Sequence, residues 1–304
     1  MLLLFVACST NDSPPESEPW AQGRFGESRS TQAEPRTKAI QDRAETPRVA
    51  AKDGDARPEV PVDEALKLAP CPRDMVLIGR FCIDRHEAHL RVITPEGVGP
   101  IHPHYERPAS GVSYRAVSTK GVFPQGYISR VEAQAACQQA GKRLCSRGEW
   151  MLACRGTKAA PTGKARARPC NNGKTHLLTQ RFGGGYDYER HFNSPELNQT
   201  PGFLAKTGAF SDCLSELGVH DMVGNLHEWV SDTVTQSFLT QFQAEVGRQY
   251  QHKQVGNGVF MGGFYSTTGE LGPGCLFTTV AHDANYHDYT TGFRCCRAKG
   301  RPGR

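Results

Sequence analysis

The chain has 304 residues, with 36 Lys and Arg against 31 Asp and Glu, and 38% of its residues are hydrophobic. Its formal net charge of +5 is modest and is not gathered in one block, which argues against a nucleic-acid-binding protein. After the first residues no stretch approaches about 20 consecutive apolar positions, so a membrane-spanning helix is excluded there. The 32 Gly and 20 Pro predict a loop-rich globular domain beside a polar segment.

The first eight residues, MLLLFVAC, form a short apolar run that ends in Ala7-Cys8. This pattern resembles the lipobox of bacterial lipoproteins, with Phe5 in place of the usual Leu. Cys8 would then be lipidated and become the first residue of the mature protein. The sequence therefore predicts an exported protein held in the cell envelope, in the periplasm or at the outer membrane, by a lipid anchor. The alternative is an uncleaved apolar start with an incidental cysteine.

Residues 9–69 are rich in Ser, Pro, Glu, Arg and Gln and show no sustained apolar periodicity. Such a segment cannot bury enough apolar surface to offset the conformational entropy that folding removes. We therefore expect a disordered linker between the anchor and a folded domain of residues 70–299.

A β-hairpin is predicted at the start of this domain. Two short apolar runs, Met75 to Ile78 and Phe81 to Ile83, are separated by a Gly-Arg pair. A disulfide between Cys71 and Cys82 could hold the two strands together. The following residues, 84–112, contain several prolines and are expected to be irregular.

Two helices are predicted between residues 129 and 154. The first begins at Ser129, an N-cap with Glu132 at the third helical position, and ends before Gly141. Its apolar residues at helical spacing are Val131, Ala135, Ala136 and Ala140. The second begins at Ser146 with Glu149 in the same arrangement. Its buried face is expected to comprise Trp150, Met151 and Ala153 or Cys154.

The segment DMVGNLHEWVSD, residues 221–232, combines features of a cation-binding loop. Gly224 and Asn225 form a turn pair that reaches left-handed backbone angles at low cost. Asp221 and Glu228 supply carboxylates on either side of them, and hard cations such as Ca²⁺ prefer carboxylate and backbone oxygens. Trp229 would bury its ring directly after the loop. The alternative is a plain turn before a core tryptophan, with solvated carboxylates.

Four segments, in this order, resemble one known family: the stretch ending in GKRLCSRGEWMLACRG, then GVHDMVGNLHEWVSD, MGGFY and TGFRCCR. GKRLCSRGEW is similar to the GKRLPTEAEW of the formylglycine-generating enzyme (sulfatase-modifying factor) family, VGNLHEW to its VGNxWEW, and GFRCCR to its closing GFR strand. The resemblance covers roughly Cys71 to Arg297. It implies an α+β domain with a compact, loop-rich, disulfide-rich variant of the C-type-lectin-like fold.

The resemblance also implies structural Ca²⁺ sites. At the first site the ligands would be the side chains of Asp221 and Glu228 and the carbonyls of Gly224 and Leu226. A second site would begin with the Asn171 side chain and the Asn172 carbonyl. Its remaining ligands would lie between Asp187 and Phe203.

Catalysis is where this chain departs from the family. The enzymes bind Cu(I) through two cysteine thiolates and use O₂ to oxidise a substrate cysteine to formylglycine. These cysteines lie three and eight positions after the Ser of the family's RGGS motif, which is Met261 to Phe264 here. The two positions are therefore Thr267 and Gly272, neither of which binds a soft metal ion. Cys275 is close but would be a single thiolate, so bound copper is not expected.

The cysteine count predicts a disulfide-rich domain. With Cys8 set aside as the lipid site, ten of the 11 cysteines remain, an even number that suits an oxidising compartment. Counting cannot fix which cysteines pair. The family resemblance implies Cys137–Cys295 and Cys154–Cys275. For the rest we expect Cys71–Cys82, Cys170–Cys213 and Cys145–Cys296.

Two functional classes follow for this domain. The first is a Ca²⁺-stabilised binding or scaffold module, with a protein or peptide ligand in the family groove and no redox centre. The second is a metal-dependent oxidoreductase of the formylglycine-generating type that acts on a protein cysteine. In AHDANYHDY, two His and two Asp could hold a non-haem iron: His282, Asp283, His287 and Asp288. A solvated polar loop is the favoured interpretation of this stretch.

Overall fold

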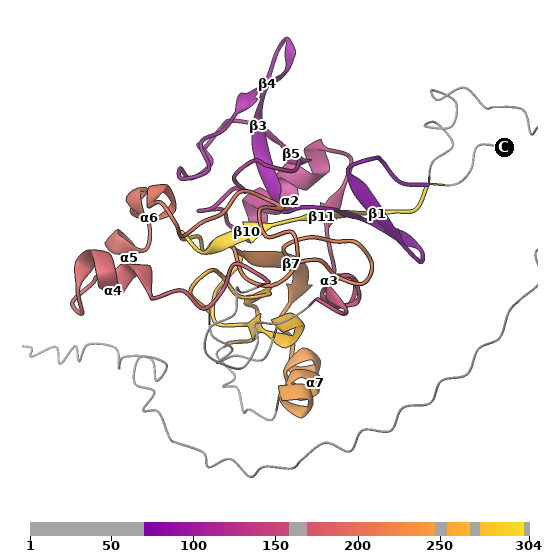
Figure 1. Ribbon diagram of the computed structural model, residues 1–304. Helices are drawn as coiled ribbons and strands as arrows, with labels where there is room; N and C mark the ends of the chain where they lie inside the picture. Colours follow the sequence, from indigo (N-terminus) through magenta and orange to yellow (C-terminus); the bar gives the residue numbers. More distant parts are fainter. Residues whose placement is uncertain (1–69, 158–168, 247–253, 268–273, 301–304) are drawn as a thin grey trace, which may run out of the picture. The chain divides into compact units, whose positions relative to one another are not determined.

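The computed structural model describes residues 70–157, 169–246, 254–267 and 274–300, and Figure 1 shows their arrangement. The lipid site Cys8, the linker of residues 9–69 and the copper-ligand position Gly272 lie outside the described residues. Within the described part of the chain, no helix is both long and apolar enough to span a membrane.

The first sheet joins the start of the domain to its end. Its strand order is β1-β2-β11-β6, with β1 at Met75–Ile78, β2 at Phe81–Asp84, β11 at Cys295–Ala298 and β6 at Arg143–Leu144. All three pairings are antiparallel. The predicted hairpin is confirmed, because Ile78 pairs with Phe81 across the turn.

The second sheet carries the strand that follows the predicted cation loop. Its order is β10-β7-β8-β9, with β10 at Thr291–Phe293, β7 at His227–Thr233, β8 at Gly258–Met261 and β9 at Thr278–Thr279. Strands β10 and β7 run parallel, and the other pairs are antiparallel. Trp229 is fully buried on β7, as expected, and its indole N–H donates to the Ile128 carbonyl at 2.9 Å.

The third sheet shows that the expectation of an irregular segment at residues 84–112 is wrong for residues 88–101 and holds for residues 102–112. Strand β3, Ala88–Thr94, lies between β4, Gly97–Ile101, and β5, Tyr114–Ser118. Pro95 occupies the turn before β4, and Pro100 lies on β4 at the edge of the sheet. An edge strand tolerates a residue that lacks a backbone N–H, so prolines here do not exclude strands.

The two predicted helices are confirmed. Helix α2 spans Arg130–Gln139 and α3 spans Arg147–Cys154, and each begins with a complete capping box, Ser129 with Glu132 and Ser146 with Glu149. The buried face of α3 comprises Trp150, Ala153 and Cys154. In α2 the buried residues are Ala133, Ala136 and Cys137, whereas Val131 and Ala135 are exposed. The expected apolar face was therefore rotated, because the disulfide cysteine Cys137 selects the face that packs inward.

The remaining helices lie at the periphery in Figure 1. They are α4, Leu177–Phe182; α5, Tyr188–His191; α6, Glu196–Gln199; α7, Gln236–Val246; and a 3₁₀ turn η3, Gly274–Leu276. Between the helices and sheets, Trp150 and Trp229 are the largest fully buried side chains and belong to two neighbouring parts of the core.

All ten cysteines from Cys71 onward form disulfides, and each expected pairing is confirmed. The pairs are Cys71–Cys82, Cys137–Cys295, Cys145–Cys296, Cys154–Cys275 and Cys170–Cys213. Each such bridge typically stabilises a domain by about 2–4 kcal/mol. Five disulfides indicate an oxidising, exported environment, because reducing compartments do not maintain them.

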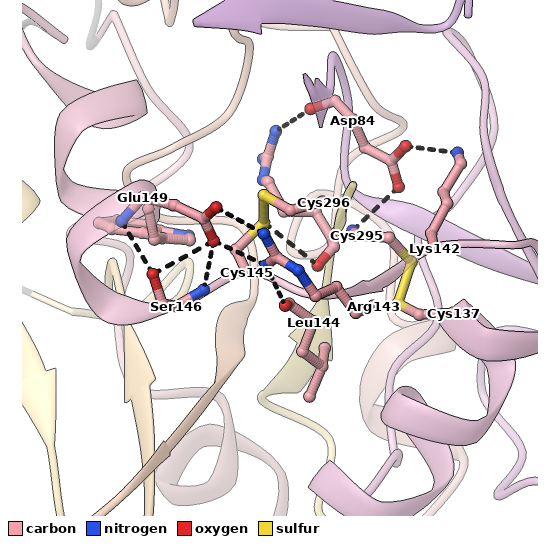
Figure 2. Close-up of a disulfide and its surroundings, with 12 residues drawn as sticks. Asp84, Cys137, Lys142, Arg143, Leu144, Cys145, Ser146, Glu149, Cys295 and Cys296 are labelled. Atoms are coloured by element: carbon pink, nitrogen blue, oxygen red, sulfur yellow. Dashed lines mark hydrogen bonds and ion pairs between the residues drawn. A yellow bond between two sulfur atoms is a disulfide. The ribbon is translucent and has the colours of Figure 1, made fainter. Parts of the chain in front are cut away.

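Adjacent cysteines on β11 lock two separate elements, as Figure 2 shows. Successive side chains of a strand point to opposite faces, so Cys295 reaches Cys137 on α2 while Cys296 reaches Cys145 before α3. Beside them the buried Asp84 accepts from Lys142 Nζ at 2.5 Å and from the backbone N–H of Cys295 at 2.9 Å. The last strand is thereby tied to α2 and to the segment that leads into α3.

Candidate functional site

The loop of residues 221–228 is built from left-handed backbone angles. Asp221, Gly224 and Asn225 have φ values of 58°, 80° and 59°. Such angles are rare for residues with a side chain, except for Asp and Asn, whose short polar groups tolerate them. The loop therefore turns sharply and delivers Glu228 directly onto β7.

Gly224 allows a close approach between this loop and the CNNGK segment. A Cβ atom at position 224 would lie 2.2 Å from the carbonyl oxygen of Asn171. That same oxygen accepts a hydrogen bond from the backbone N–H of Asn225 at 2.8 Å. The two segments expected to hold calcium are thus in direct contact.

Glu228 is engaged by a buried arginine. The guanidinium of Arg294 donates Nε to Oε2 and Nη2 to Oε1, each at 2.6 Å, and the indole N–H of Trp150 donates to Oε2 at 2.7 Å. Arg294 also donates to the carbonyls of Asp84 and His220. Because both partners are buried, this two-point ion pair cross-links the end of the loop to the last strand.

A third carboxylate, Glu87, was missed by the sequence reasoning. It is fully buried and accepts from Asn225 Nδ2 at 2.6 Å and from the backbone N–H of Leu226 at 3.2 Å. Burial raises its pKa well above the usual range, and the negative charges of Asp221 and Glu228 raise it further. A lone Glu beside a predicted hairpin gives no sequence signal that it reaches a loop more than 130 residues away.

Asp221 completes a cluster in which carboxyl groups outnumber cations. One of its oxygens accepts from the backbone N–H of Gly208 at 2.6 Å, and burial raises its pKa to about 6. Three carboxylates, those of Glu87, Asp221 and Glu228, thus surround the single guanidinium of Arg294. A cation would favour the charged forms of Glu87 and Asp221, which burial disfavours.

The expected first site contains carboxylate oxygens, which a hard cation prefers, but protein donors already bind them. Asp221 accepts from the backbone N–H of Gly208, and both oxygens of Glu228 accept from Arg294. Among the described residues no group of three or more His, Cys, Asp or Glu side chains is placed to hold a metal ion. An ion here would therefore depend on backbone carbonyls, as the family resemblance implies for Gly224 and Leu226.

At the second expected site Asn171 reaches Phe203 as a hydrogen-bond donor. Asn171 is buried, and its side-chain Nδ2 donates to the Phe203 carbonyl and to Asn225 Oδ1. Lys174, which the sequence reasoning did not single out, donates its ammonium group to the carbonyls of Gly202 and Phe203. The structure thus brings Asn171 to Phe203, and the Lys174 ammonium group donates to the same carbonyl oxygen.

Of the two positions of the family's copper cysteines, the structure describes only Thr267, which has no thiol. Thr267 is buried, and its Oγ1 accepts from the backbone N–H of Phe264 at 2.8 Å. Cys275 is bound to Cys154. Thr267 and Cys275 therefore offer no pair of soft ligands for Cu(I).

His227 lies next to this position, at the place of the first Trp in the family's VGNxWEW. Its ring packs among Phe260, Phe264 and Phe277 at centroid distances of 4.8, 5.2 and 5.4 Å. Burial lowers the pKa of His227 to about 3, so the imidazole is neutral. His227 and the three phenylalanines therefore form an aromatic cluster, in which His227 is buried.

The residues considered for an iron site do not converge. Asp288 is buried and accepts from the hydroxyl of Tyr286 at 2.6 Å and from the backbone N–H of Thr290 at 2.8 Å. His287 bonds Asn193 Oδ1 at 2.8 Å, and His282 stacks on Tyr286. Each side chain has its own partner. They form a structural part of the loop before β10.

Residues 79–299 match the Sulfatase-modifying factor enzyme 1-like domain. A curated relative, Inactive C-alpha-formylglycine-generating enzyme 2 of Bos taurus, is 26% identical over 187 residues, which cover 59% of this chain and 52% of the relative. The chain spans about half the length of this relative.

Similar solved structures include the Major Tropism Determinant I1 variant, with 15% identity, a TM-score of 0.41 and coverage of 76% of this chain and 54% of that one. PvdO from Pseudomonas aeruginosa has 14% identity, a TM-score of 0.34 and coverage of 72% and 94%. CarF has 14% identity, a TM-score of 0.37 and coverage of 72% and 87%.

The family match covers most of the described domain and includes the loop of residues 221–228, the Phe264 region and the closing β11 strand. The expected α+β, loop-rich and disulfide-rich fold of the formylglycine-generating type is confirmed. The chain belongs to the family of the sulfatase-modifying factor enzyme 1-like domain.

Proposed function

We propose that this protein is an exported, non-catalytic binding module of its family. The observation that carries the proposal is the replacement of the copper cysteine pair by Thr267 and Gly272, together with the disulfide that occupies Cys275. Cu(I) requires soft ligands, and a disulfide sulfur is not a thiolate. The bovine relative is named as an inactive formylglycine-generating enzyme, which supports the same interpretation.

The ligand of such a module would bind at the surface around Phe264. Aromatic rings of His176, Phe264 and His227 follow one another there at centroid distances of 6.4 and 5.2 Å. Aromatic side chains are common in protein-binding surfaces because they bury much area at little entropic cost. A protein or peptide segment with apolar side chains is the ligand that suits this surface.

Two further features belong to the proposal. Lipidation at Cys8 would hold the module in the cell envelope, and replacing Cys8 by Ser should move the protein from the membrane fraction to the soluble fraction of an expressing bacterium. A Ca²⁺ ion held by Asp221, Glu228 and the carbonyls of Gly224 and Leu226 would stabilise the fold rather than take part in chemistry.

Free thiols decide between a binding module and a metal-dependent oxidoreductase acting on a protein cysteine. The whole chain is exported to an oxidising compartment, alkylated without reduction and analysed by mass spectrometry. We expect no alkylation at any cysteine from Cys71 onward. Alkylation of Cys275 and one other cysteine, with protection by Cu(I), would overturn the proposal.

A gain-of-function variant sharpens this test. Thr267→Cys with Gly272→Cys restores the family's cysteine pair, and we expect it to bind one Cu(I) that the wild-type chain does not bind. The matched control, Thr267→Ser with Gly272→Ser, has similar size without thiols. Equal copper binding by the wild type would contradict the proposed loss of the centre.

A further inference from the structure

Lys174 lies where the family resemblance implies the second calcium ion. Its Nζ donates to the carbonyl oxygen of Gly202 at 2.6 Å and to that of Phe203 at 2.7 Å. The ring of Phe210 lies 5.9 Å from the same ammonium group. Carbonyl oxygens and an aromatic face both attract a cation, so this position already holds a positive charge that the chain itself supplies.

The side-chain amide of Asn171 presents its donor side to the same carbonyl. Nδ2 of Asn171 donates to the Phe203 oxygen at 2.9 Å and to Asn225 Oδ1 at 2.7 Å. Its oxygen, on the other side of the amide group, is buried and has no hydrogen-bond partner within the described ranges. A metal ion shared by Asn171 and Phe203 would need an oxygen where the N–H groups now point.

Asn225 prevents the Asn171 amide from turning over. Asn225 Oδ1 also accepts from the backbone N–H of Ala205 at 3.0 Å, and Asn225 Nδ2 donates to the Ala205 carbonyl at 3.2 Å. A backbone N–H can only donate and a carbonyl can only accept, which fixes the orientation of Asn225. Turning Asn171 would then place two amide oxygens against each other and lose a buried hydrogen bond.

We infer that Lys174 is a built-in replacement for the second calcium ion of this fold. Its tethered ammonium group joins the CNNGK segment to the Gly202–Phe203 carbonyls, and Asn171 acts as a hydrogen-bond donor in the same junction rather than as a metal ligand. Asn171 and Asn172 therefore do not fit a divalent cation. A second positive ion would be repelled by the ammonium group, whereas the lysine holds the junction at any calcium concentration.

The test uses the full chain after removal of metal ions with EDTA. Calcium binding is measured by isothermal titration calorimetry, and Tm is measured with EDTA and with Ca²⁺. The variants are Lys174→Met, which keeps the stem and removes the charge, and Lys174→Arg, which keeps the charge. Lys206→Met is the matched control, because Lys206 is exposed and lies over the ring of Phe123 at 5.6 Å. Asp221→Asn removes a carboxylate of the first site.

We expect the Asp221→Asn chain to bind no Ca²⁺. In EDTA, Lys174→Met should lower Tm by a few degrees, whereas Lys174→Arg and Lys206→Met should keep Tm close to that of the wild type. Two calcium ions bound by the wild type, or a wild-type Tm in Lys174→Met, would overturn the inference. A wild-type chain that binds none refutes only the first-site proposal, because the lowered Tm of Lys174→Met in EDTA would still support the lysine's role.

Discussion

The two loops that the family resemblance assigns to calcium differ in the charged side chains around them. In the loop of residues 221–228, the carboxyl groups of Asp221, Glu228 and Glu87 outnumber the one guanidinium beside them, that of Arg294. In the junction of residues 171–174 with 202–203, a lysine already holds the carbonyls. Backbone geometry alone therefore does not decide whether a loop takes up an ion, because neighbouring side chains set the charge that remains to be compensated.

The largest effect is expected from breaking the ion pair at the first loop. Glu228→Gln leaves the buried Arg294 without its carboxylate and should lower the free energy of unfolding by about 3–5 kcal/mol, measured by urea denaturation. Arg181→Met is the control, because Arg181 and Glu196 form an ion pair with side chains 52% and 56% exposed. That control should cost at most about 1 kcal/mol. Similar losses in both variants would show that the first loop does not depend on Arg294.

A matched pair of glycines compares the backbone of the two loops. Gly224→Ala should be strongly destabilising, because the new Cβ would lie 2.2 Å from the Asn171 oxygen at a φ of +80°. Gly202→Ala has a similar φ of +85° with no atom within 4 Å of the new Cβ. It should therefore cost only the left-handed strain of about 1–2 kcal/mol. Equal midpoints in urea for the two variants would contradict the close approach of the loops.

Acid should destabilise the fold through histidines outside both loops. Burial lowers the pKa of His89 from 6.5 to about 4. Between these two pH values the imidazole is protonated in the unfolded chain and neutral in the folded chain. This contribution is complete above pH 6.5 and is lost as pH falls toward 4, with about 2 kcal/mol lost by pH 5. Urea unfolding at pH 7 and pH 5 measures it, and His89→Gln should reduce the pH dependence. An unchanged slope in that variant would show that His89 titrates normally.

The smallest effect is expected from calcium itself. At a free Ca²⁺ concentration ten times Kd, binding at the first loop should stabilise the wild type by about 1.4 kcal/mol. Asp221→Asn should remove this increment while the Lys174 junction stays intact. The same Tm with EDTA and with Ca²⁺ in the wild type would refute a cation at the first loop.

Features set by neighbouring residues could be predicted from the sequence. Both capping boxes follow from a Ser with a Glu three positions later, and the hairpin follows from two apolar runs around a turn. The disulfide pairs could be predicted because cysteines are few and the family resemblance constrains two of the pairs. Such signals are local or depend on a rare residue type.

The electrostatics of the site could not be predicted in the same way. Glu87, Lys174 and Arg294 each act on a partner far along the chain, and each is an ordinary charged residue without a distinctive spacing. The prediction that Val131 lies on the apolar face of α2 was wrong for a related reason. The inward face of α2 is set by the disulfide from Cys137 to Cys295. Tertiary contacts override helical spacing when a short helix has small apolar residues on several sides.

The two disulfides of β11 have a consequence for how the protein is made. Three cysteines pair with partners 158, 151 and 121 residues further along the chain: Cys137, Cys145 and Cys154. Their disulfides can form only after the last part of the chain has been made. A polypeptide that enters an oxidising compartment N-terminus first would carry these three thiols unpaired until residues 275–296 arrive. During export, a chaperone or disulfide isomerase would therefore have to protect this protein from mispairing until its final strand is in place.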